Sequence, residues 1–597
     1  MPDPSTANVP LLVFDGDCSF CRIWIGYWKR LTGASVAYAT YQEVAERFPQ
    51  IPSENFKQAV QLILPDGEVL SAAHGVFRSL AYVPGYGWLL WAYLHVPGFA
   101  AVAGWLYRRV AAHRSFFYHA TVFLWGKHLE PATYEISVRW FMRSLGTIYF
   151  AAFSSLLVQV TGLIGARGIL PATRYTDAVH EVYGASAWLR LPTIFLLGSS
   201  DALLKVACIV GAIAALAIIL GLARRAALVV VFVLYLSLVH VSQTFLSFQW
   251  DYLLLETGFA AIFLLPVFSR VWIFRWLLFR LMFLSGTAKL LSHDRAWRNL
   301  TALTFHYETQ PLPTRFGWYF HQFPADFQKF SCLFVFFVEL VVPFLMFAPR
   351  RVRFFAATMT VSLQVLIFMT GNYAFFNLLA VALCLLLIDD AAFRRTHGAA
   401  VRTKTMAPWR AVTAVLVSFI MLVSGLQLLE TFSGAIPGRA AAALGWTAPF
   451  GVVNTYGLFA VMTTSRSEII VEGSNDGQTW LEYGFKYKPG DLKRAPVWVQ
   501  PHQPRLDWQM WFAALSNYQA HPWFVNFAVR LLEGSPDVLA LIARNPFPSA
   551  PPRYVRARVY DYRFTNFAER RATGDWWRRE LKGDYLPVVS LRAVQRE

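Results

Sequence analysis

Hydrophobic residues are distributed differently in three parts of the chain. Between about Arg143 and Glu430, long apolar segments follow one another with few charges inside them, whereas charge is dense before Trp140 and after Ser465. A helix needs about 20 apolar residues to cross a bilayer core of about 30 Å. We therefore expect the middle of the chain to cross a membrane repeatedly and the two ends to be soluble.

The middle part contains nine segments that are candidate spans, of which the fourth and the eighth are short. They are Ser144–Ile164, Leu203–Leu222, Ala226–Leu246, Tyr252–Val267, Trp272–Leu291, Phe330–Phe347, Phe354–Thr370, Ala374–Ile388 and Trp409–Leu429. This pattern predicts a polytopic α-helical transmembrane domain of about nine spans over residues 139–430.

The loops between these segments predict an orientation, because Lys and Arg in short loops favour the cytoplasmic side. With the N-terminus inside, the inside loops carry Arg224, Arg225, Arg270, Arg275, Arg350, Arg351, Arg353, Arg394, Arg395, Arg402 and Lys404. The short outside turns, Ser247–Trp250 and Gly371–Tyr373, carry none. Met1–Pro10 lacks the features of a cleaved signal peptide. We expect a cytoplasmic N-terminus and, with an odd number of spans, an extracytoplasmic C-terminus.

The two soluble ends show different patterns. Residues 1–118 predict a compact α/β domain from the strands Pro10–Phe14, Ser35–Thr40, Ala59–Leu64 and Glu68–Leu70 and the helices Cys21–Leu31 and Ala73–Tyr82. Residues 446–597 predict a mixed, β-rich soluble domain from the strands Glu468–Val471, Trp480–Tyr487 and Arg553–Phe564. Its two amphipathic segments, Leu506–Leu515 and Pro522–Leu532, are expected as helices on the membrane surface or against the strands.

Composition supports the membrane assignment. Hydrophobic residues make up 56% of the 597 and charged residues 15%, against about a quarter charged in ordinary soluble domains. The net charge is +18, and many of the Lys and Arg residues sit in short clusters between apolar segments, which favours a lipid bilayer and argues against nucleic acid as the partner. Only five cysteines are present and none follows Ser433, so no disulfide framework is expected in the C-terminal domain.

Two of those cysteines form a Cys-x-x-Cys pair, Cys18 and Cys21, between a predicted strand and a predicted helix. This spacing places the first thiol at the helix N-terminus, where the dipole stabilises a thiolate, and lets the second resolve a mixed disulfide. The carboxylates of Asp15 and Asp17 oppose thiolate formation, and the sequence leaves open which effect is larger. A pair of small core residues is the plain alternative. Zinc is not favoured, because His74 stands alone.

The stretch from about Val9 to Phe117 resembles the DCC family of thiol–disulfide oxidoreductase-like proteins. The resemblance rests on the Asp17-Cys18-x-x-Cys21 motif and on the closing stretches Val96–Phe99 and Leu106–Ala111. It implies a thioredoxin-like fold with Asp17, Cys18 and Cys21 as the functional residues and a thiol-redox partner. In thioredoxins a cis-proline faces the cysteines, whereas no proline directly precedes Ala59–Leu64 here.

Polar residues at membrane depth are functional candidates by default, because burying them is costly. The candidate polar site consists of Gln249, Asp251, Glu256, His306, Glu308, Glu339, Asn372 and Asn377. Simple anchoring at the interface is an equal alternative for Asp251. No metal or cofactor is expected.

From Arg139 almost to its end, the chain resembles the lipase maturation factor family. The motifs that carry this resemblance are Ile164–Pro171, Phe248–Glu256, His306–Pro313, Gly371–Asn377 and Pro504–Phe512. The animal members are endoplasmic-reticulum membrane proteins that help secreted dimeric lipases to reach an active fold. The resemblance implies a chaperone-like maturation factor for an exported client such as a lipase, in the plasma membrane of a bacterium or the endoplasmic reticulum of a eukaryote.

Two other functions remain open. The first is an integral membrane enzyme that acts on a lipid-soluble cofactor or substrate through its buried carboxylates. The second is a transporter, which the lack of internal repeats and of broken spans makes the weaker reading. In every case the cysteine pair would lie on the reducing side of the membrane, away from exported clients.

Overall fold

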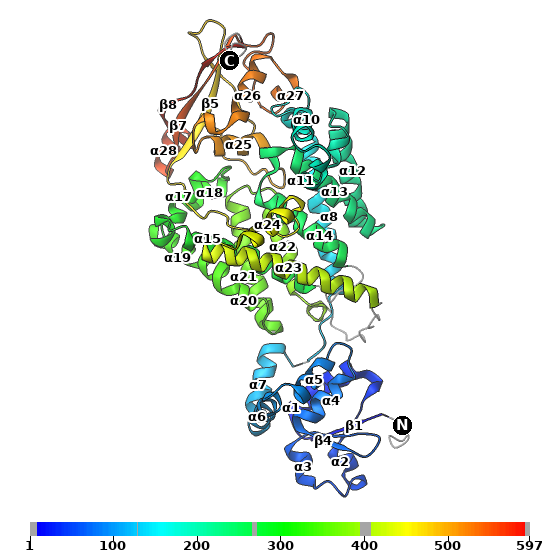
Figure 1. Ribbon diagram of the computed structural model, residues 1–597. Helices are drawn as coiled ribbons and strands as arrows, with labels where there is room; N and C mark the ends of the chain where they lie inside the picture. Colours follow the sequence, from blue (N-terminus) through cyan, green and yellow to red (C-terminus); the bar gives the residue numbers. More distant parts are fainter. Residues whose placement is uncertain (1–8, 128, 265–270, 394–406, 592–597) are drawn as a thin grey trace. The chain divides into compact units, whose positions relative to one another are not determined.

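The computed structural model describes residues 9–127, 129–264, 271–393 and 407–591 (Figure 1). It divides into two compact units, of which the first holds Met1–Thr133, Ala348–Phe354 and Asp389–Ala399 and the second holds the rest of the chain. Some predicted features lie outside the described residues: the end of the span Tyr252–Val267 and the loop residues Arg270, Arg394, Arg395, Arg402 and Lys404.

The first unit is built on a four-stranded sheet in the order β2-β1-β3-β4. β1 (Leu11–Phe14) pairs in parallel with β2 (Ala37–Thr40), and because parallel neighbours need a crossover, α1 (Ser19–Thr32) connects them. β3 (Gln61–Ile63) runs antiparallel to both β1 and β4 (Val69–Ser71). The predicted α/β domain is confirmed. The remaining helices of this unit are α2 (Tyr41–Val44), α3 (Ser53–Gln58), α4 (Ala72–Ala81), α5 (Gly87–His95), α6 (Phe99–Ala112) and α7 (Arg114–Trp125).

Alternating side chains of the strands divide the core of this unit into two layers. Leu12 and Leu62 pack with Ile25 of α1 on one face of the sheet. Val13 and Ile63 pack with Phe56 of α3 on the other face. α1 therefore lies against the sheet along its length, which fixes the position of its N-terminus.

The second unit begins with a helical bundle. Its helices are α8 (Glu135–Leu157), α9 (Val160–Ile164), α10 (Ala172–Tyr183), α11 (Ala187–Arg190), α12 (Asp201–Leu220), α13 (Arg224–Val241), α14 (Gln249–Leu264), α15 (Val271–Leu291), α16 (Arg295–Arg298), α17 (Ala302–Thr309), α18 (Arg315–His321), α19 (Ala325–Phe336), α20 (Val342–Leu345), α21 (Arg350–Thr370), α22 (Phe376–Cys384), α23 (Ala407–Ser433) and α24 (Gly438–Thr447). A π-helical segment, Phe337–Val341, joins α19 to α20.

Six helices among the described residues are long and apolar enough to cross a membrane, which makes this a multi-pass membrane protein. They are Asp201–Leu220, Arg224–Val241, Val271–Leu291, Ala325–Leu345, Arg350–Thr370 and Ala411–Ser433. The bent pair formed by α5 and α6, with 113° between its helices, would be a seventh by the same measure. Six of the nine predicted spans coincide with these helices.

The other three predicted spans fall on helices that are shorter or more polar. Ser144–Ile164 covers parts of α8 and α9, Tyr252–Val267 falls on α14, and Ala374–Ile388 falls on the apolar stretch Phe376–Leu387. α8 has the length of a span, but it carries Arg139 and Arg143 and buries twelve of its residues inside the bundle. Nine spans therefore stays a prediction.

Glycines bring α8 and α12 close together, as small residues do between membrane helices. A Cβ atom at Gly211 would lie 2.4 Å from Cε1 of Phe153, a fully buried ring on α8. A Cβ atom at Gly425 of α23 would meet nothing within 4 Å. The two glycines are a matched pair for testing this contact.

We expect Gly211→Ala to lower the free energy of unfolding by about 1–3 kcal/mol, because the added methyl group overpacks the contact with Phe153. Gly425→Ala should be neutral or slightly stabilising. Thermal unfolding of both variants in the same detergent measures the difference. Equal midpoints for the two variants would contradict this packing of α8 on α12.

The second unit ends in a four-stranded antiparallel sheet in the order β6-β5-β7-β8. The strands are β5 (Arg466–Ser474), β6 (Leu481–Glu482), β7 (Tyr554–Phe564) and β8 (Trp577–Val589). The helices are α25 (Arg505–Ala513), α26 (Pro522–Leu532), α27 (Pro536–Leu539) and α28 (Phe567–Thr573). The prediction of a C-terminal region containing β-structure is confirmed.

One detail of this region differs from the prediction, and one predicted alternative is confirmed. The strand predicted over Trp480–Tyr487 pairs with β5 only at Leu481–Glu482, because the chain then turns and Gly484 bridges to Arg544. For the two amphipathic helices, the predicted position against the strands is confirmed: α25 packs against β5 and α26 against β7, with most of their side chains buried.

Candidate functional site

The cysteine pair lies where β1 leads into α1. Cys18 is the N-cap residue of α1, with φ −78° and ψ 108°, and its Sγ accepts a hydrogen bond from the backbone N–H of Cys21 at 3.3 Å. Backbone amides and the positive end of a helix dipole stabilise negative charge at this position. The strand–helix context predicted for the pair is therefore present, with the sulfur of Cys18 at the N-terminus of α1.

The second cysteine is in a different environment. Burial is the largest cause that raises the pKa of the Cys21 thiol to about 12, and the hydrogen bond and charge interaction with Cys18 contribute to the same shift. Cys21 is therefore a protonated thiol at neutral pH. This division suits an exchange reaction in which Cys18 attacks and Cys21 resolves the mixed disulfide.

Both acidic residues of the motif have polar partners. Asp15 lies 3.6 Å from Nη1 of Arg114, and Nε2 of Gln42 donates to Asp15 Oδ1 and to Asp17 Oδ2, each at 3.2 Å. These contacts compensate part of the negative charge of Asp15 and Asp17, the charge that opposes thiolate formation. Sequence reasoning did not identify Arg114, because nothing near this residue on α7 sets it apart from its neighbouring arginines.

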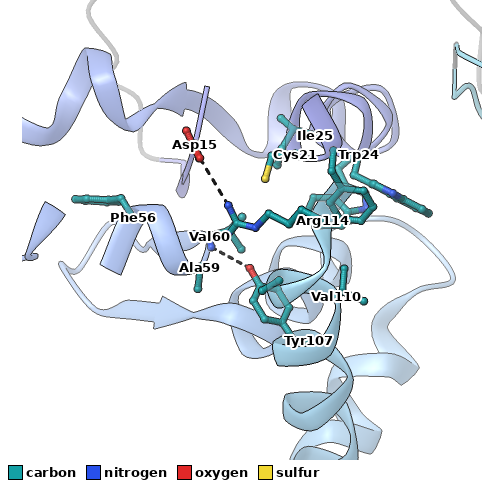
Figure 2. Close-up of a pocket in the computed structure, with 13 residues that line it drawn as sticks. Asp15, Cys21, Trp24, Ile25, Phe56, Ala59, Val60, Tyr107, Val110 and Arg114 are labelled. Atoms are coloured by element: carbon teal, nitrogen blue, oxygen red, sulfur yellow. Dashed lines mark hydrogen bonds and ion pairs between the residues drawn. The ribbon is translucent and has the colours of Figure 1, made fainter. Parts of the chain in front are cut away.

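A cavity of about 60 Å³ lies beside Cys21 (Figure 2). Its walls are mainly apolar and include Trp24, Ile25 and Val60, while Arg114 and Asp15 form its polar edge. The Tyr107 hydroxyl accepts a hydrogen bond from the backbone N–H of Val60 at 3.0 Å. Ala59 and Val60, directly before β3, line the same cavity as Cys21. The cavity can accept an apolar side chain next to a reacting disulfide.

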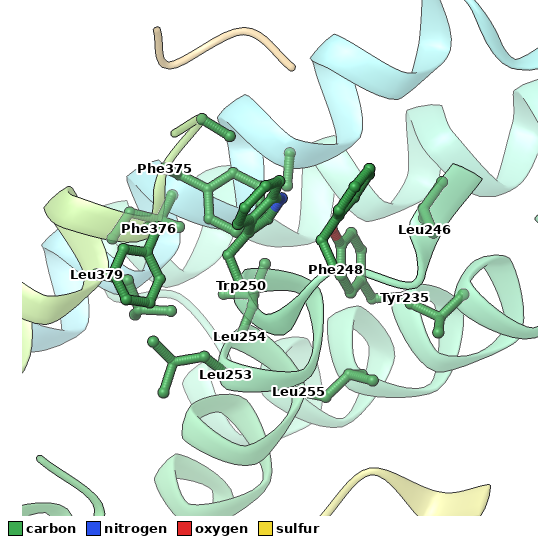
Figure 3. Close-up of a cluster of buried hydrophobic side chains, with 14 of the residues drawn as sticks. Tyr235, Leu246, Phe248, Trp250, Leu253, Leu254, Leu255, Phe375, Phe376 and Leu379 are labelled. Atoms are coloured by element: carbon green, nitrogen blue, oxygen red, sulfur yellow. The ribbon is translucent and has the colours of Figure 1, made fainter. Parts of the chain in front are cut away.

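The eight polar candidates of the helical bundle do not form one site. Asp251 is fully buried and forms a two-point ion pair with Arg505 of α25, with N–O distances of 2.7 and 2.8 Å. The Tyr235 hydroxyl donates to the same carboxylate at 2.6 Å. The apolar wall beside this pair comes from the predicted motif, where Phe248 and Trp250 stack with centroids 4.6 Å apart (Figure 3).

Glu256 and Gln249 also bind the segment that leads to the C-terminal sheet. Glu256 pairs with Arg280 and accepts hydrogen bonds from Asn454 N–H at 2.9 Å and from the Tyr456 hydroxyl at 2.7 Å. Gln249 Oε1 accepts from the N–H of residue 457 at 3.1 Å.

Glu308, Asn372 and Asn377 make similar structural contacts. Glu308 accepts from the Phe564 N–H of β7 at 2.9 Å. Asn372 donates to the Val497 carbonyl and accepts from the Val499 N–H, both at 2.8 Å. Asn377 donates to Gln364 at 2.8 Å. Five of the eight candidates thus bind the C-terminal part of the chain, and Asn377 links α22 to α21.

The remaining two candidates, His306 and Glu339, line one cavity together with Lys289.

The sequence did not identify the basic partners Arg280, Arg466 and Arg505, although Arg505 lies inside the motif Pro504–Phe512. Arg466 of β5 is buried, pairs with Glu468 and donates to the carbonyls of Glu308 and Pro311. Within the described part of the chain, no group of three His, Cys, Asp or Glu side chains could hold a metal ion.

Comparison with known proteins assigns all three regions. Residues 136–395 match the lipase maturation factor transmembrane domain, residues 452–587 the lipase maturation factor C-terminal domain, and residues 12–119 a DCC1-like thiol-disulfide oxidoreductase. No solved structure is significantly similar.

Curated relatives cover most of the chain. It is 37% identical to lipase maturation factor 2 of Gallus gallus over 76% of this chain and 81% of that protein. The corresponding values are 36%, 76% and 82% for lipase maturation factor 2 of Homo sapiens and 34%, 78% and 89% for lipase maturation factor 1 of Mus musculus. The chain therefore belongs to the lipase maturation factor family and carries a DCC1-like thiol-disulfide oxidoreductase domain near its N-terminus.

Proposed function

We propose that this protein is a membrane-embedded, chaperone-like maturation factor for exported proteins such as lipases, fused to a cytoplasmic thioredoxin-like exchange domain. Its domains are residues 1–118, 139–430 and 446–597, with about nine spans, the N-terminus inside and the C-terminal domain outside. The names of its relatives support a lipase as the client. The cysteine pair would act on a separate redox partner inside the cell.

The observation that carries this proposal is how the bundle holds the C-terminal part. The predicted outside turns and helix ends, around Asp251, Ser292 and Asn372, all contact residues beyond 450. Buried ion pairs of this kind fix geometry but leave no reactive carboxylate free. The bundle then holds the outer domain in a fixed orientation, in which this domain can bind clients.

The surface of that outer domain supports binding of unfolded chains. Large apolar side chains remain exposed on it, among them Trp498, Leu515 and Phe567, which are 50%, 46% and 54% exposed. A contiguous exposed apolar patch marks a binding surface on a soluble protein, and we assign these side chains to such a surface. A client that has not completed its own core could cover them transiently.

The test uses the native host with the gene deleted and a secreted lipase as reporter. We expect the full chain to raise the specific activity of the secreted lipase at least tenfold over the deletion strain. The double variant Cys18→Ser, Cys21→Ser should retain this effect, because the pair lies on the other side of the membrane from the client. Equal lipase activity with and without the chain would refute the proposal.

The membrane-enzyme alternative is favoured by one observation, the placement of His306 and Glu339 at a cavity. Glu256 does not support it, because Arg280, Asn454 and Tyr456 already occupy its carboxylate. Glu339→Gln in a folded chain separates the two functions. Unchanged lipase activity would exclude a catalytic carboxylate from maturation.

A further inference from the structure

A cavity of about 80 Å³ lies inside the helical bundle, where the C-terminal part covers it. Its walls come from α15, α16, α17, α19, the π-helical segment Phe337–Val341, α21 and α22, and Tyr373, Leu458 and Phe459 complete them. π-helical turns inside α-helices occur frequently at functional sites. The cavity thus combines an unusual helical turn with side chains from segments far apart in the sequence.

Its charged groups are fully compensated. Lys289 Nζ donates to Glu339 Oε2 at 2.8 Å and Oε1 at 3.1 Å, to the Ser285 carbonyl at 3.2 Å and to the Leu458 carbonyl at 3.1 Å. A buried ion pair with all its hydrogen bonds made presents no net charge to the cavity. A charged ligand would therefore find no counter-ion here.

His306 supplies the unused polar atom. Its Nε2 lies 3.3 Å from the Tyr373 hydroxyl, which itself donates to Gln310 Oε1 at 2.8 Å, so Nε2 carries the proton in this network. Burial and the positive charge of Lys289 lower the pKa of His306 to about 4, which keeps the ring neutral at physiological pH. Nδ1 is then an acceptor, and it has no hydrogen-bond partner among the described residues.

Water alone fits this cavity poorly. About 80 Å³ has room for roughly five to eight waters, each of which needs two to four polar partners. The ion pair is already satisfied, and most of the remaining wall is apolar, including Met282, Leu303, Ile367 and Phe376. The wall is suited to an apolar body with a single polar group.

We propose that this cavity is a binding site for a small, uncharged, lipophilic molecule with one hydroxyl group, which donates its hydrogen bond to Nδ1 of His306. The site goes beyond client maturation, because it shares no lining residue with Trp498, Leu515 and Phe567, the exposed side chains that we assign to clients. The apolar wall would hold the body of the ligand, and the hydroxyl would select it from hydrocarbons of the same size.

The test uses the full chain in lipid nanodiscs and two photoreactive probes. One is a benzyl alcohol bearing a trifluoromethyl diazirine, and the other is its methyl ether, which has no donor. We expect the alcohol to label peptides of α15 and α17 about three- to tenfold more than the ether, the range of one neutral hydrogen bond. Equal labelling by both probes in the native chain would overturn the proposal.

Two variants and a control locate the site. His306→Phe should make the two probes label equally, because it removes the acceptor and keeps an aromatic ring. Ser285→Phe should abolish labelling by filling the cavity, whereas Ser362→Phe on α21, outside the cavity, should leave it unchanged. Labelling that persists in a folded Ser285→Phe chain would place the probe elsewhere. The native-chain comparison decides the question even if a variant does not fold.

Discussion

Arg505→Ala is expected to destabilise the membrane unit by about 3–5 kcal/mol, enough to prevent recovery of a monodisperse protein. Arg505 and Asp251 are 2% and 0% exposed, and their two-point ion pair joins α25 to the start of α14. Without the guanidinium, the Asp251 carboxylate would remain buried without its counter-ion. Size-exclusion chromatography in detergent, followed by thermal unfolding of any recovered protein, measures the loss.

A surface ion pair is the matched control. Arg578 pairs with Glu569 at 3.0 Å, and their side chains are 58% and 36% exposed. Exposed pairs of this kind contribute about 0–1 kcal/mol, so Arg578→Ala should behave like the native chain. The double variant Arg505→Met, Asp251→Leu should recover part of the lost stability, because it leaves no buried charge unpaired. If Arg505→Ala unfolds with the native midpoint, the pair does not hold the two parts together.

The local elements near the cysteines could be predicted from sequence, because each depends on neighbouring residues. The apolar run before Asp15, the Cys-x-x-Cys spacing and the amphipathic helix that follows are all local patterns, and β1 and α1 form where they predict. The contact between Asp15 and Arg114 is not local. It depends on how α7 packs against α1, which no periodicity encodes.

The same distinction explains the polar candidates of the bundle. Asp251 and Glu256 stood out because carboxylates are costly at membrane depth, but sequence could not show that basic residues were there to pair with them. Arg505 follows Asp251 by 254 positions. The sequence pattern indicates a separate soluble domain for the C-terminal part, and this interpretation contains no contact between that part and the buried carboxylates.

β8 was missed for a physical reason as well. Lys582, Gly583 and Asp584 interrupt its apolar alternation, and the register against β7 shifts at several positions along the pair. Gly583 has φ of 152°, a conformation that glycine adopts readily. An irregular strand of this kind carries a weak sequence signal, because its neighbours and not its own pattern hold it in the sheet.

Alkylation of Cys21 is expected to be at least 100-fold slower in the folded Cys18→Ser chain than in the same chain unfolded. Burial, the largest cause, and the contacts with Cys18 together raise the pKa of Cys21 to about 12, whereas an unfolded cysteine has a pKa of about 8.5. A raised pKa keeps the thiol protonated, so at pH 8 the reactive thiolate falls from about a quarter of the molecules to about one in ten thousand. Replacing Cys18 removes the smaller part of this pKa shift that Cys18 causes. The expected factor is therefore at least 100-fold and not the full ratio of the two thiolate fractions.

Mass spectrometry after timed reaction with iodoacetamide measures this rate, and the rate should keep rising with pH beyond pH 10. The Cys21→Ser chain is the matched partner. Its Cys18 lies at the helix N-terminus and should react at pH 8 while Cys21 in the other variant does not. Because only an attacking thiolate forms a mixed disulfide, Cys21→Ser should also trap a redox partner through Cys18 in cells. If Cys21 reacts as fast as Cys18 at pH 8, the two thiols do not have the separate roles that their environments indicate.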